Sequence, residues 1–407
     1  MKHILIIGAG FAGLWSAIAA ARRLQETGTR AQITVLNRDA YHGIRVRYYE
    51  EDLGNTRVPL RQVLDPVGVK LVVGEVTGID PGKRRVDALV EGSPRALFYD
   101  KLVIASGSAL ALPAIPGLAE HAFDIDTHAS AMRLQAHVRQ LAHAVRRPGW
   151  LTAVVVGAGA TGVELACELP ARLRAAAQAS GIPDAEAEVR VILADREATA
   201  CAQLGGARPV IERACAELGV ELLSSVAVKA ISPDGVTFDN GSILPSSTVV
   251  WCAGMRASPL NGQVSAKLDA SWRLYVDACL KVKGFDDVFA AGDAAHMLID
   301  GKMPSVMSCQ HARPMGRFAG QNVVNDLIGP PLEPLHIDWY TNIIDLGPWG
   351  AVYAEGWDRA VRSEGEIAKQ TKTVINRERI YPPLTGDKAA ILAASVLHIQ
   401  RPPSIGR

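Results

Sequence analysis

Two stretches of the chain share one pattern of apolar and polar positions. A strand-like apolar run begins at His3 and another at Ala153, and each leads through a glycine-rich turn into an alanine-rich helical segment. Each helix is followed by a further apolar strand, at 32–37 and at 189–195. Strand, helix and strand in this order form a right-handed crossover between parallel strands. The pattern therefore predicts an α/β fold with two doubly wound, Rossmann-type dinucleotide-binding domains.

Both turns have the sequence Gly-x-Gly-x-x-Gly, at 8–13 and at 157–162. The first glycine permits the tight turn, the second lets a pyrophosphate approach the backbone, and the third lets helix and strand pack closely. The N-terminus of the following helix faces the phosphates. One match of this kind is weak evidence, and two glycine turns without a ligand are the alternative. Two matches, each between an apolar strand and a helix, favour two nucleotide sites.

Further apolar segments complete the map. Segments 69–76, 97–105, 248–254 and 287–291 are typical of buried strands. From about Leu332 the pattern changes to short strands and irregular segments, which predicts a small C-terminal domain.

Composition narrows the function classes. The chain has 407 residues, long enough for two or three domains, and its net charge is +1, which gives no attraction to nucleic acid or an anionic membrane. Its six cysteines are scattered, without a CxxC or a metal-ligand pattern, and are expected to be reduced thiols. No signal peptide and no apolar run of about 18 residues is present, so we expect a cytoplasmic protein without a transmembrane anchor or a metal site.

The motifs together resemble the flavoproteins with two dinucleotide-binding domains, the pyridine nucleotide-disulfide oxidoreductase-like superfamily, and within it the type II NADH dehydrogenases. The resemblance covers roughly residues 3–330 and includes GAGFAG from Gly8, ASG from Ala105, GAGATGVELACEL from Gly157, WCAGMRA from Trp251 and VFAAGDAAH from Val288. It implies FAD at the first glycine motif and NAD(P)H at the second.

The implied domains are an FAD-binding domain formed by residues 1–115 and 275–330, an NAD(P)H-binding domain at 116–274 and a C-terminal domain at 331–407. The residues expected to line the cofactor sites are Gly8, Gly10, Phe11, Ala12, Gly13, Asn37, Arg38, Val76, Ala105, Gly107, Gly292 and Asp293, together with Gly157, Gly159, Thr161, Gly162, Asp195 and Gly254.

Two positions bear on nucleotide binding. An acidic residue usually ends the second strand of such a unit and accepts hydrogen bonds from both ribose hydroxyls, but Asn37 has one acceptor oxygen, so this contact with FAD is expected to be weaker. The second unit keeps the acid as Asp195. A carboxylate there repels a 2′-phosphate, which favours NADH over NADPH, although the adjacent Arg196 could reverse the preference.

The resemblance implies hydride transfer from NAD(P)H to the flavin and then electron transfer to an acceptor. Glu164 is the candidate for orienting the nicotinamide or relaying protons, and a solvated carboxylate in the first helical turn is the alternative. Gln310 matches the first glutamine of a quinone-pocket motif, but Pro314 replaces its second polar residue, so a helix end packed under the flavin is the alternative. Further candidates for the acceptor face are Tyr41, Arg45, Arg47, Tyr48 and Tyr49.

Other chemistry is disfavoured. The segment 40–50 has no cysteine, which excludes the disulfide chemistry of related reductases. A sulfide-oxidising thiol pair would have to use Cys167 and Cys309, and Cys167 is better explained as a core residue. Segment 368–380 is too polar for a membrane-binding amphipathic helix, and segment 387–398 suits core or homodimer packing.

Three hypotheses remain from the sequence. The first is an FAD-dependent NADH:quinone-type oxidoreductase with a soluble or weakly lipophilic small-molecule acceptor. The second is a tailoring flavoenzyme that acts on a specialised small metabolite. The third is a flavin-based redox-responsive binding protein.

Overall fold

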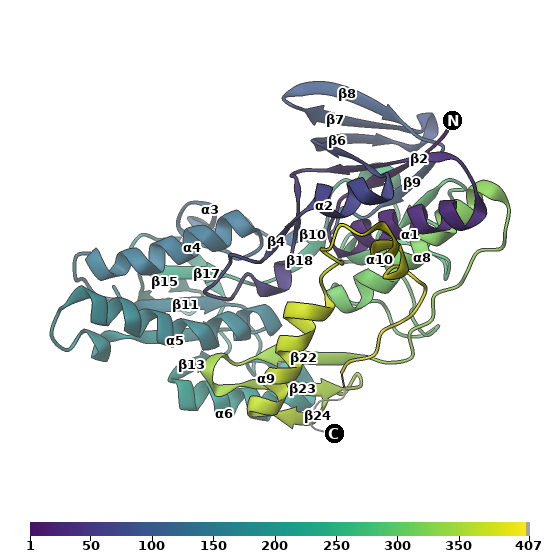
Figure 1. Ribbon diagram of the computed structural model, residues 1–407. Helices are drawn as coiled ribbons and strands as arrows, with labels where there is room; N and C mark the ends of the chain where they lie inside the picture. The colour runs from purple at the N-terminus through teal and green to yellow at the C-terminus, as the bar shows by residue number, and fades with distance from the viewer. Residues whose placement is uncertain (404–407) are drawn as a thin grey trace.

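The computed structural model describes residues 1–403 and contains two parallel sheets in separate lobes (Figure 1). In the first sheet all neighbouring strands are parallel and follow the order β20-β9-β1-β2-β5. Its strands are β1 (Lys2–Ile7), β2 (Ala31–Asn37), β5 (Lys70–Val73), β9 (Lys101–Ile104) and β20 (Val288–Ala290). Apolar side chains bury both faces of these strands, as is typical of a parallel sheet covered by helices.

The second sheet repeats the arrangement with the order β13-β12-β11-β17. Its strands are β11 (Thr152–Val156), β12 (Arg190–Ala194), β13 (Val220–Leu223) and β17 (Thr248–Trp251). All its neighbouring strands are parallel, and α5 (Ala160–Ser180) forms the crossover from β11 to β12. The prediction of an α/β fold with two Rossmann-type units is confirmed. The domain limits at 115, 274 and 330 stay a prediction.

Two predicted strands are each divided between different sheets. Segment 69–76 contains β5 of the first parallel sheet and the beginning of β6 (Glu75–Asp80), and the chain changes sheet at Gly74. Segment 97–105 likewise contains the end of β8 (Ser93–Phe98) and all of β9. Together with β7 (Arg85–Val90), β6 and β8 form an antiparallel sheet beside the first lobe (Figure 1). Apolar content alone does not show such a change of sheet, so the prediction of single strands was wrong.

The remaining elements are short or connect the sheets. The helices are α2 (Leu60–Leu64), α3 (Leu118–His121), α4 (His128–Gln140), α6 (Arg208–Leu218) and α7 (Asn261–Val264). The minor strands are β3 (Tyr41–Gly43), β4 (Arg57–Pro59), β10 (Ser108–Leu110), β14 (Val228–Ser232), β15 (Gly235–Phe238), β16 (Ile243–Pro245), β18 (Met255–Ala257), β19 (Leu274–Tyr275) and β21 (Ala295–His296).

The C-terminal region forms an antiparallel sheet and two helices. The strands are β22 (Thr341–Asp345), β23 (Ala351–Glu355) and β24 (Ala360–Glu364), and the helices are α9 (Gly365–Val374) and α10 (Lys388–Ala393). The sheet and α9 lie near α5 and α6, whereas α10 lies beside α1 (Figure 1). The sequence predicts a helix within 387–398, and the observed helix is shorter, at Lys388–Ala393.

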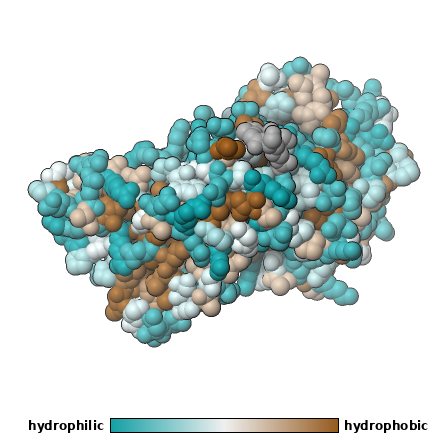
Figure 2. Space-filling model, turned by 90° about the horizontal axis from the view of Figure 1, so that it is seen from below, coloured by the Kyte–Doolittle hydropathy of each residue, from teal (hydrophilic) through white to brown (hydrophobic). Residues whose placement is uncertain are grey.

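Figure 2 shows the face that the C-terminal region occupies. Hydrophobic residues there form separate patches with hydrophilic residues between them. Among the described residues, none of the helices combines the length and the apolar character needed to cross a bilayer.

Helices α1 (Phe11–Thr27) and α8 (Cys309–Ile328) pack with their backbones in close contact. A Cβ atom on Gly316 would lie closer than 3.0 Å to the carbonyl oxygen of Ala12, and one on Gly320 would do the same with Ser16. The two glycines, one turn apart, form a groove into which α1 fits.

We predict that Gly320→Ala lowers the free energy of unfolding by about 1–3 kcal/mol, because the added methyl group forces α1 and α8 apart. The matched control is Gly262→Ala, since a Cβ atom there meets no neighbouring atom within 4 Å. Denaturant unfolding of both variants measures the difference. Equal stability of the two variants would show that the helices separate without strain.

Candidate functional site

The first glycine turn leaves space above the N-terminus of α1. Gly8 has a φ of +91°, and a Cβ atom there would clash with the carbonyl oxygen of Ala105. A Cβ atom on Gly13 would clash with the carbonyl oxygen of Gly8. A Cβ atom on Gly10, by contrast, meets nothing within 4 Å, and no side chain caps the helix that follows. Free helical N–H groups beside open space suit a pyrophosphate.

The second turn has the same geometry. Gly157 has a φ of +105°, and a Cβ atom on Gly162 would clash with the carbonyl oxygen of Gly157. A Cβ atom on Gly159 would meet only the flexible end of Gln203, at 3.1 Å, and α5 has no side-chain cap. The chain thus has two turns of equivalent geometry, each suited to an anion.

Asn37 and Asp195 play the same local role in the two units. The Asn37 Oδ1 atom accepts the N–H of Ala9 at 2.9 Å, and the Asp195 Oδ2 atom accepts that of Ala158 at 2.9 Å. Asp195 also accepts the N–H of Glu197 through Oδ1, at 3.0 Å. Both side chains therefore brace the glycine turn, and only their remaining lone pairs are free for a ribose.

A third group of residues closes the first site from the other side. A Cβ atom on Gly292 would meet the Cβ atoms of Ala12 and Ala312, so the Gly292–Asp293 turn, α1 and α8 meet at one point. Ser108 donates to the Asp293 carboxylate at 2.6 Å. Burial raises the pKa of Asp293, and the hydrogen bond from Ser108 opposes this shift.

Buried polar atoms beside this point lack partners. Burial lowers the pKa of His42 to about 4, so its ring is neutral at pH 7. The His42 Nδ1 atom lies 2.9 Å from the carbonyl oxygen of Ala9 and must donate to it, which leaves Nε2 as an acceptor. Neither this atom nor the Ser106 hydroxyl has a partner within residues 1–403. Such groups fit the hydroxyl and N–H groups of a flavin nucleotide.

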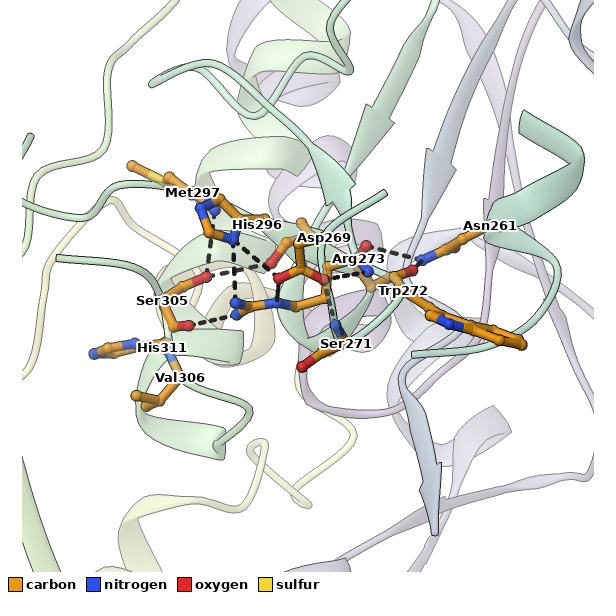
Figure 3. Close-up of polar contacts among 12 residues, drawn as sticks. Asn261, Asp269, Ser271, Trp272, Arg273, His296, Met297, Ser305, Val306 and His311 are labelled. Carbon is orange, nitrogen blue, oxygen red and sulfur yellow. Dashed lines mark hydrogen bonds and ion pairs between the residues drawn. The ribbon is translucent and has the colours of Figure 1, made fainter. Parts of the chain in front are cut away.

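A hydrogen-bond network holds the closing turn and the start of α8 in place (Figure 3). Arg273 donates to the Asp269 carboxylate at 2.7 Å and to the carbonyl oxygen of Ser305 at 2.5 Å. Burial alone would raise the pKa of Asp269, but its hydrogen bonds with Arg273 outweigh burial and the pKa is lowered. Beyond Ser305, the N–H of Val306 donates to His311 in the first turn of α8, at 2.9 Å.

Glu164 forms a buried ion pair with a residue of the C-terminal region. Lys372 of α9 donates to the Glu164 Oε1 atom at 2.5 Å and to the carbonyl oxygen of Ile343 at 3.0 Å, and the exposures of the two residues are only 6%. Burial raises the pKa of Glu164. Burial alone would lower the pKa of Lys372, but Glu164 and Asp345 outweigh it and the pKa is raised. The alternative interpretation of Glu164 as a solvated carboxylate was wrong.

A cavity of about 220 Å³ borders this ion pair. Its lining includes Tyr49, Glu168, Asp345, Lys372 and Asn376. Tyr49 donates to Asp345 at 3.2 Å, and the Asn376 Nδ2 atom has no partner in the described part of the chain. The cavity therefore joins polar groups of both lobes to the C-terminal region. A larger hollow of about 560 Å³ lies between segment 51–57 and α4, and none of the predicted site residues lines it.

The acceptor-face candidates are only partly free. Arg45 forms an ion pair with Asp126, and Arg47 forms one with Glu50. Both guanidinium groups are thus neutralised within the protein. Gln310, in the first turn of α8, accepts a 3.3 Å hydrogen bond from Thr341, and its Nε2 atom has no partner among residues 1–403. Of the tyrosines, Tyr48 and Tyr49 are buried and Tyr41 is exposed beneath Arg57.

The other predicted cofactor residues lie around the same two turns. Phe11 packs edge-on against His42, and Gly107 has open space beside it. Arg38 and Thr161 are exposed, Ala105 is buried under Gly8, Val76 packs against the first core, and Gly254 lies beside Ala111. Sequence reasoning did not single out His42 or Lys372, and only the structure brings these residues to the site.

Cys167 and Cys309, the two candidates for a sulfide-oxidising pair, do not form a disulfide. All six thiols are free, and Cys167 contacts Cys215 instead of Cys309. The contact with Cys215 and burial raise the pKa of Cys167 well above its usual value, and burial raises that of Cys309. Raised thiol pKa values disfavour the nucleophilic thiolate.

Known proteins are similar to this chain along most of its length. The family model described as pyridine nucleotide-disulphide oxidoreductase matches residues 2–316. The chain belongs to this family. An NADH dehydrogenase-like protein of Mycobacterium tuberculosis is 50% identical over 408 residues, covering 99% of this chain and 100% of that protein. A type II NADH:quinone oxidoreductase of Staphylococcus saprophyticus is 26% identical over 401 residues, covering 93% and 95% of the two chains.

Solved structures show the same fold. NDH2 from Plasmodium falciparum in complex with NADH aligns with a TM-score of 0.77 at 13% identity, covering 97% of each chain. The sulfide:quinone oxidoreductase of Aquifex aeolicus aligns with a TM-score of 0.76 at 21% identity. The alignment covers 96% of this chain and 93% of the Aquifex chain. The chain is therefore an NADH dehydrogenase-like flavoprotein oxidoreductase by family and fold.

We predict that Lys372→Met costs about 3–5 kcal/mol of stability, because it leaves the Glu164 carboxylate buried without its partner. Combining it with Glu164→Gln restores part of the loss, since no unpaired charge then remains. A double-mutant cycle by denaturant unfolding measures the coupling. Additive losses in the double variant would mean that the two groups act independently.

Proposed function

We propose that this protein is an FAD-dependent oxidoreductase that takes hydride from NAD(P)H, with NADH favoured, and passes electrons to a small quinone-like acceptor. The observation that carries the proposal is the pair of glycine turns, each with its middle glycine beside open space and an uncapped helix behind it. A family member with two such turns can hold two dinucleotides at once.

The residues present fit FAD at the first turn. Gly10 leaves room for its pyrophosphate, and the Gly292–Asp293 turn faces the same place from the other side. His42 offers an unpaired acceptor and Ser106 an unpaired hydroxyl there. When bound, FAD supplies the redox chemistry, taking up a hydride from the nicotinamide and releasing electrons to the acceptor.

Glu164 and Lys372 are the residues that we assign to proton transfer. A quinone that is reduced to a quinol takes up protons as well as electrons. The 2.5 Å contact between the Lys372 ammonium and the Glu164 carboxylate allows a proton to pass between them without bulk water. The bordering cavity, with Glu168 in its lining, provides a route for water to reach the pair. We assign Gln310, whose amide nitrogen lacks a partner, to the acceptor side.

The proposal that the acceptor is a quinone rests on proteins similar to this chain. The staphylococcal relative is named an NADH:quinone oxidoreductase, and it matches this chain along nearly its full length. Arg45 and Arg47 each form an ion pair with a carboxylate of the protein. Neither arginine therefore offers a free charge to an acceptor at this segment.

The test uses purified protein loaded with FAD, under anaerobic conditions. NADH should bleach the visible flavin absorbance, and a quinone should restore it. A panel of quinone, dye, disulfide and oxygen acceptors then ranks the acceptor classes. A flavin that stays oxidised in excess NADH and NADPH would contradict the proposal, and reduction without turnover by any acceptor would favour a redox-responsive binding protein.

We predict that Gly10→Val and Gly159→Val affect different cofactors. Both positions have negative φ, and an added Cβ atom would meet no rigid group at either, so we expect both variants to fold. Gly10→Val should purify without flavin, because the side chain fills the pyrophosphate space. Gly159→Val should stay yellow, while its KM for NADH rises about tenfold or more. Loss of flavin from both variants would contradict separate sites.

We predict that Asp195→Asn raises the ratio of kcat/KM for NADPH to that for NADH by about tenfold, since it removes the charge that repels a 2′-phosphate. Asn37 shows that an amide can accept the turn N–H at the same distance. Steady-state kinetics with both nucleotides measures the ratio. Glu197→Gln is the control for the loss of a nearby negative charge. If both variants change the NADPH/NADH ratio equally, the selectivity comes from the overall negative charge of this region and not from the Asp195 side chain.

A further inference from the structure

Two arginines of α8 stack on one buried indole ring. The guanidinium carbons of Arg313 and Arg317 lie 5.1 and 4.4 Å from the centre of the Trp15 ring. Trp15 is 1% exposed and Arg317 is 7% exposed, while Arg313 is half-buried. Two positive charges are thus held below the surface at one place, between α1 and α8.

These charges have no counterion within residues 1–403. Neither arginine forms an ion pair there, and Arg313 makes no hydrogen bond in that part of the chain. Arg317 donates once, to the carbonyl oxygen of His398 at 2.9 Å. The Nε atoms of both arginines and the Trp15 Nε1–H are buried without partners among the same residues. Three buried donors close to one another therefore lack an acceptor among the described residues.

Stacking alone does not account for this arrangement. A cation–π contact contributes about 0.5–2 kcal/mol. Burying a charge without a partner costs several kcal/mol after relaxation. Burial, with the neighbouring Arg313, lowers the pKa of Arg317 to about 10, in agreement with that cost. By contrast, Arg45 and Arg47 each have a carboxylate partner.

The cluster lies next to the acceptor side assigned above. Gln310, Arg313 and Arg317 follow one stripe of α8, because they are three and seven residues apart. At 1.5 Å per residue, the two arginines lie about 4.5 and 10 Å along the helix from Gln310. Such a span is comparable to a two-ring aromatic acceptor with a substituent. Trp15 is five residues, about 7.5 Å, beyond the Gly10 turn that we assign to the FAD pyrophosphate.

We propose that Arg313 and Arg317, stacked on Trp15, bind an anionic group that the electron acceptor carries, of the carboxylate, sulfonate or phosphate class. The inference rests on the proposed function, because it places the acceptor along α8. Burial lowers the pKa of Arg313, and a third arginine, Arg379, lies close enough to lower it further. Arg379 donates to the carbonyl oxygen of Arg401 at 2.9 Å, and Arg317 donates to that of His398, so segment 398–401 borders the cluster and forms one wall of the proposed site.

The first experiment measures anion binding without turnover. Thermal unfolding of the FAD-loaded protein is followed in inorganic phosphate and in chloride at equal ionic strength, for the wild type, Arg313→Gln, Arg317→Gln and Arg313→Lys. Arg61→Gln is the matched control. Arg61 is exposed, lies outside the α1–α8 contact, and forms only a long ion pair, 3.8 Å, with Asp65. Phosphate should raise the Tm of the wild type and the control, and the shift should be lost in both glutamine variants and partly kept in Arg313→Lys. An equal phosphate shift in all five proteins overturns the proposal.

The second experiment identifies the source of the anion. The wild type and variants are compared with 1,4-naphthoquinone-2-sulfonate and with the neutral 2-methyl-1,4-naphthoquinone. Arg313→Gln should lower kcat/KM for the sulfonate by about tenfold or more and change that for the neutral quinone by less than about twofold. Equal losses with both quinones, or loss of FAD from the variant, would show that the arginines serve the fold or the flavin and would overturn the proposal. If the wild type reduces neither quinone, the proposed function fails, while the phosphate shift still decides the anion site.

Discussion

Direct backbone contact at glycine determines how the elements around the first glycine turn are placed. Gly316 and Gly320 bring α8 onto the carbonyl oxygens of α1, and Gly292 brings the closing turn onto Ala12. A Cβ atom at any of these positions would lie closer than 3.0 Å to an atom of α1, so the elements would have to move apart. The N-terminus of α1 and the start of α8 therefore approach one point from two directions. Functional residues on either helix acquire their positions from this packing.

Electrostatics then divides the charged residues into two groups. Arg45, Arg47 and Lys372 each meet a carboxylate inside the protein, so their charge is balanced before any ligand arrives. Arg313 and Arg317 meet an indole ring instead. The charges of Glu164 and Lys372 balance each other inside the protein, whereas two cations without a carboxylate partner attract an anion. The two groups therefore suit two different tasks at neighbouring places.

How much the sequence reveals depends on how far apart the interacting residues lie along it. The glycine turns are local, and their spacing and strand–helix context were sufficient to predict both Rossmann-type units. The partner of Glu164 is Lys372, 208 positions away, on a helix that the sequence pattern described only as polar. Arg313 lies in the segment that resembles a quinone-pocket motif, but its stacking on Trp15 depends on the α1–α8 contact. Long-range pairs of this kind leave no periodic signal.

The C-terminal region also acquires a function from its contacts. Its segment 368–380 is too polar for a membrane surface, and in the structure two of its polar side chains face inward: Lys372 neutralises Glu164 and Asn376 lines the adjoining cavity. Further along, the carbonyl oxygens of His398 and Arg401 accept hydrogen bonds from Arg317 and Arg379. The same region thus supplies the proton-handling partner and one wall of the anion site. The polarity of the groups that this region places beside α8 favours an acceptor with a charged substituent over a purely hydrocarbon one.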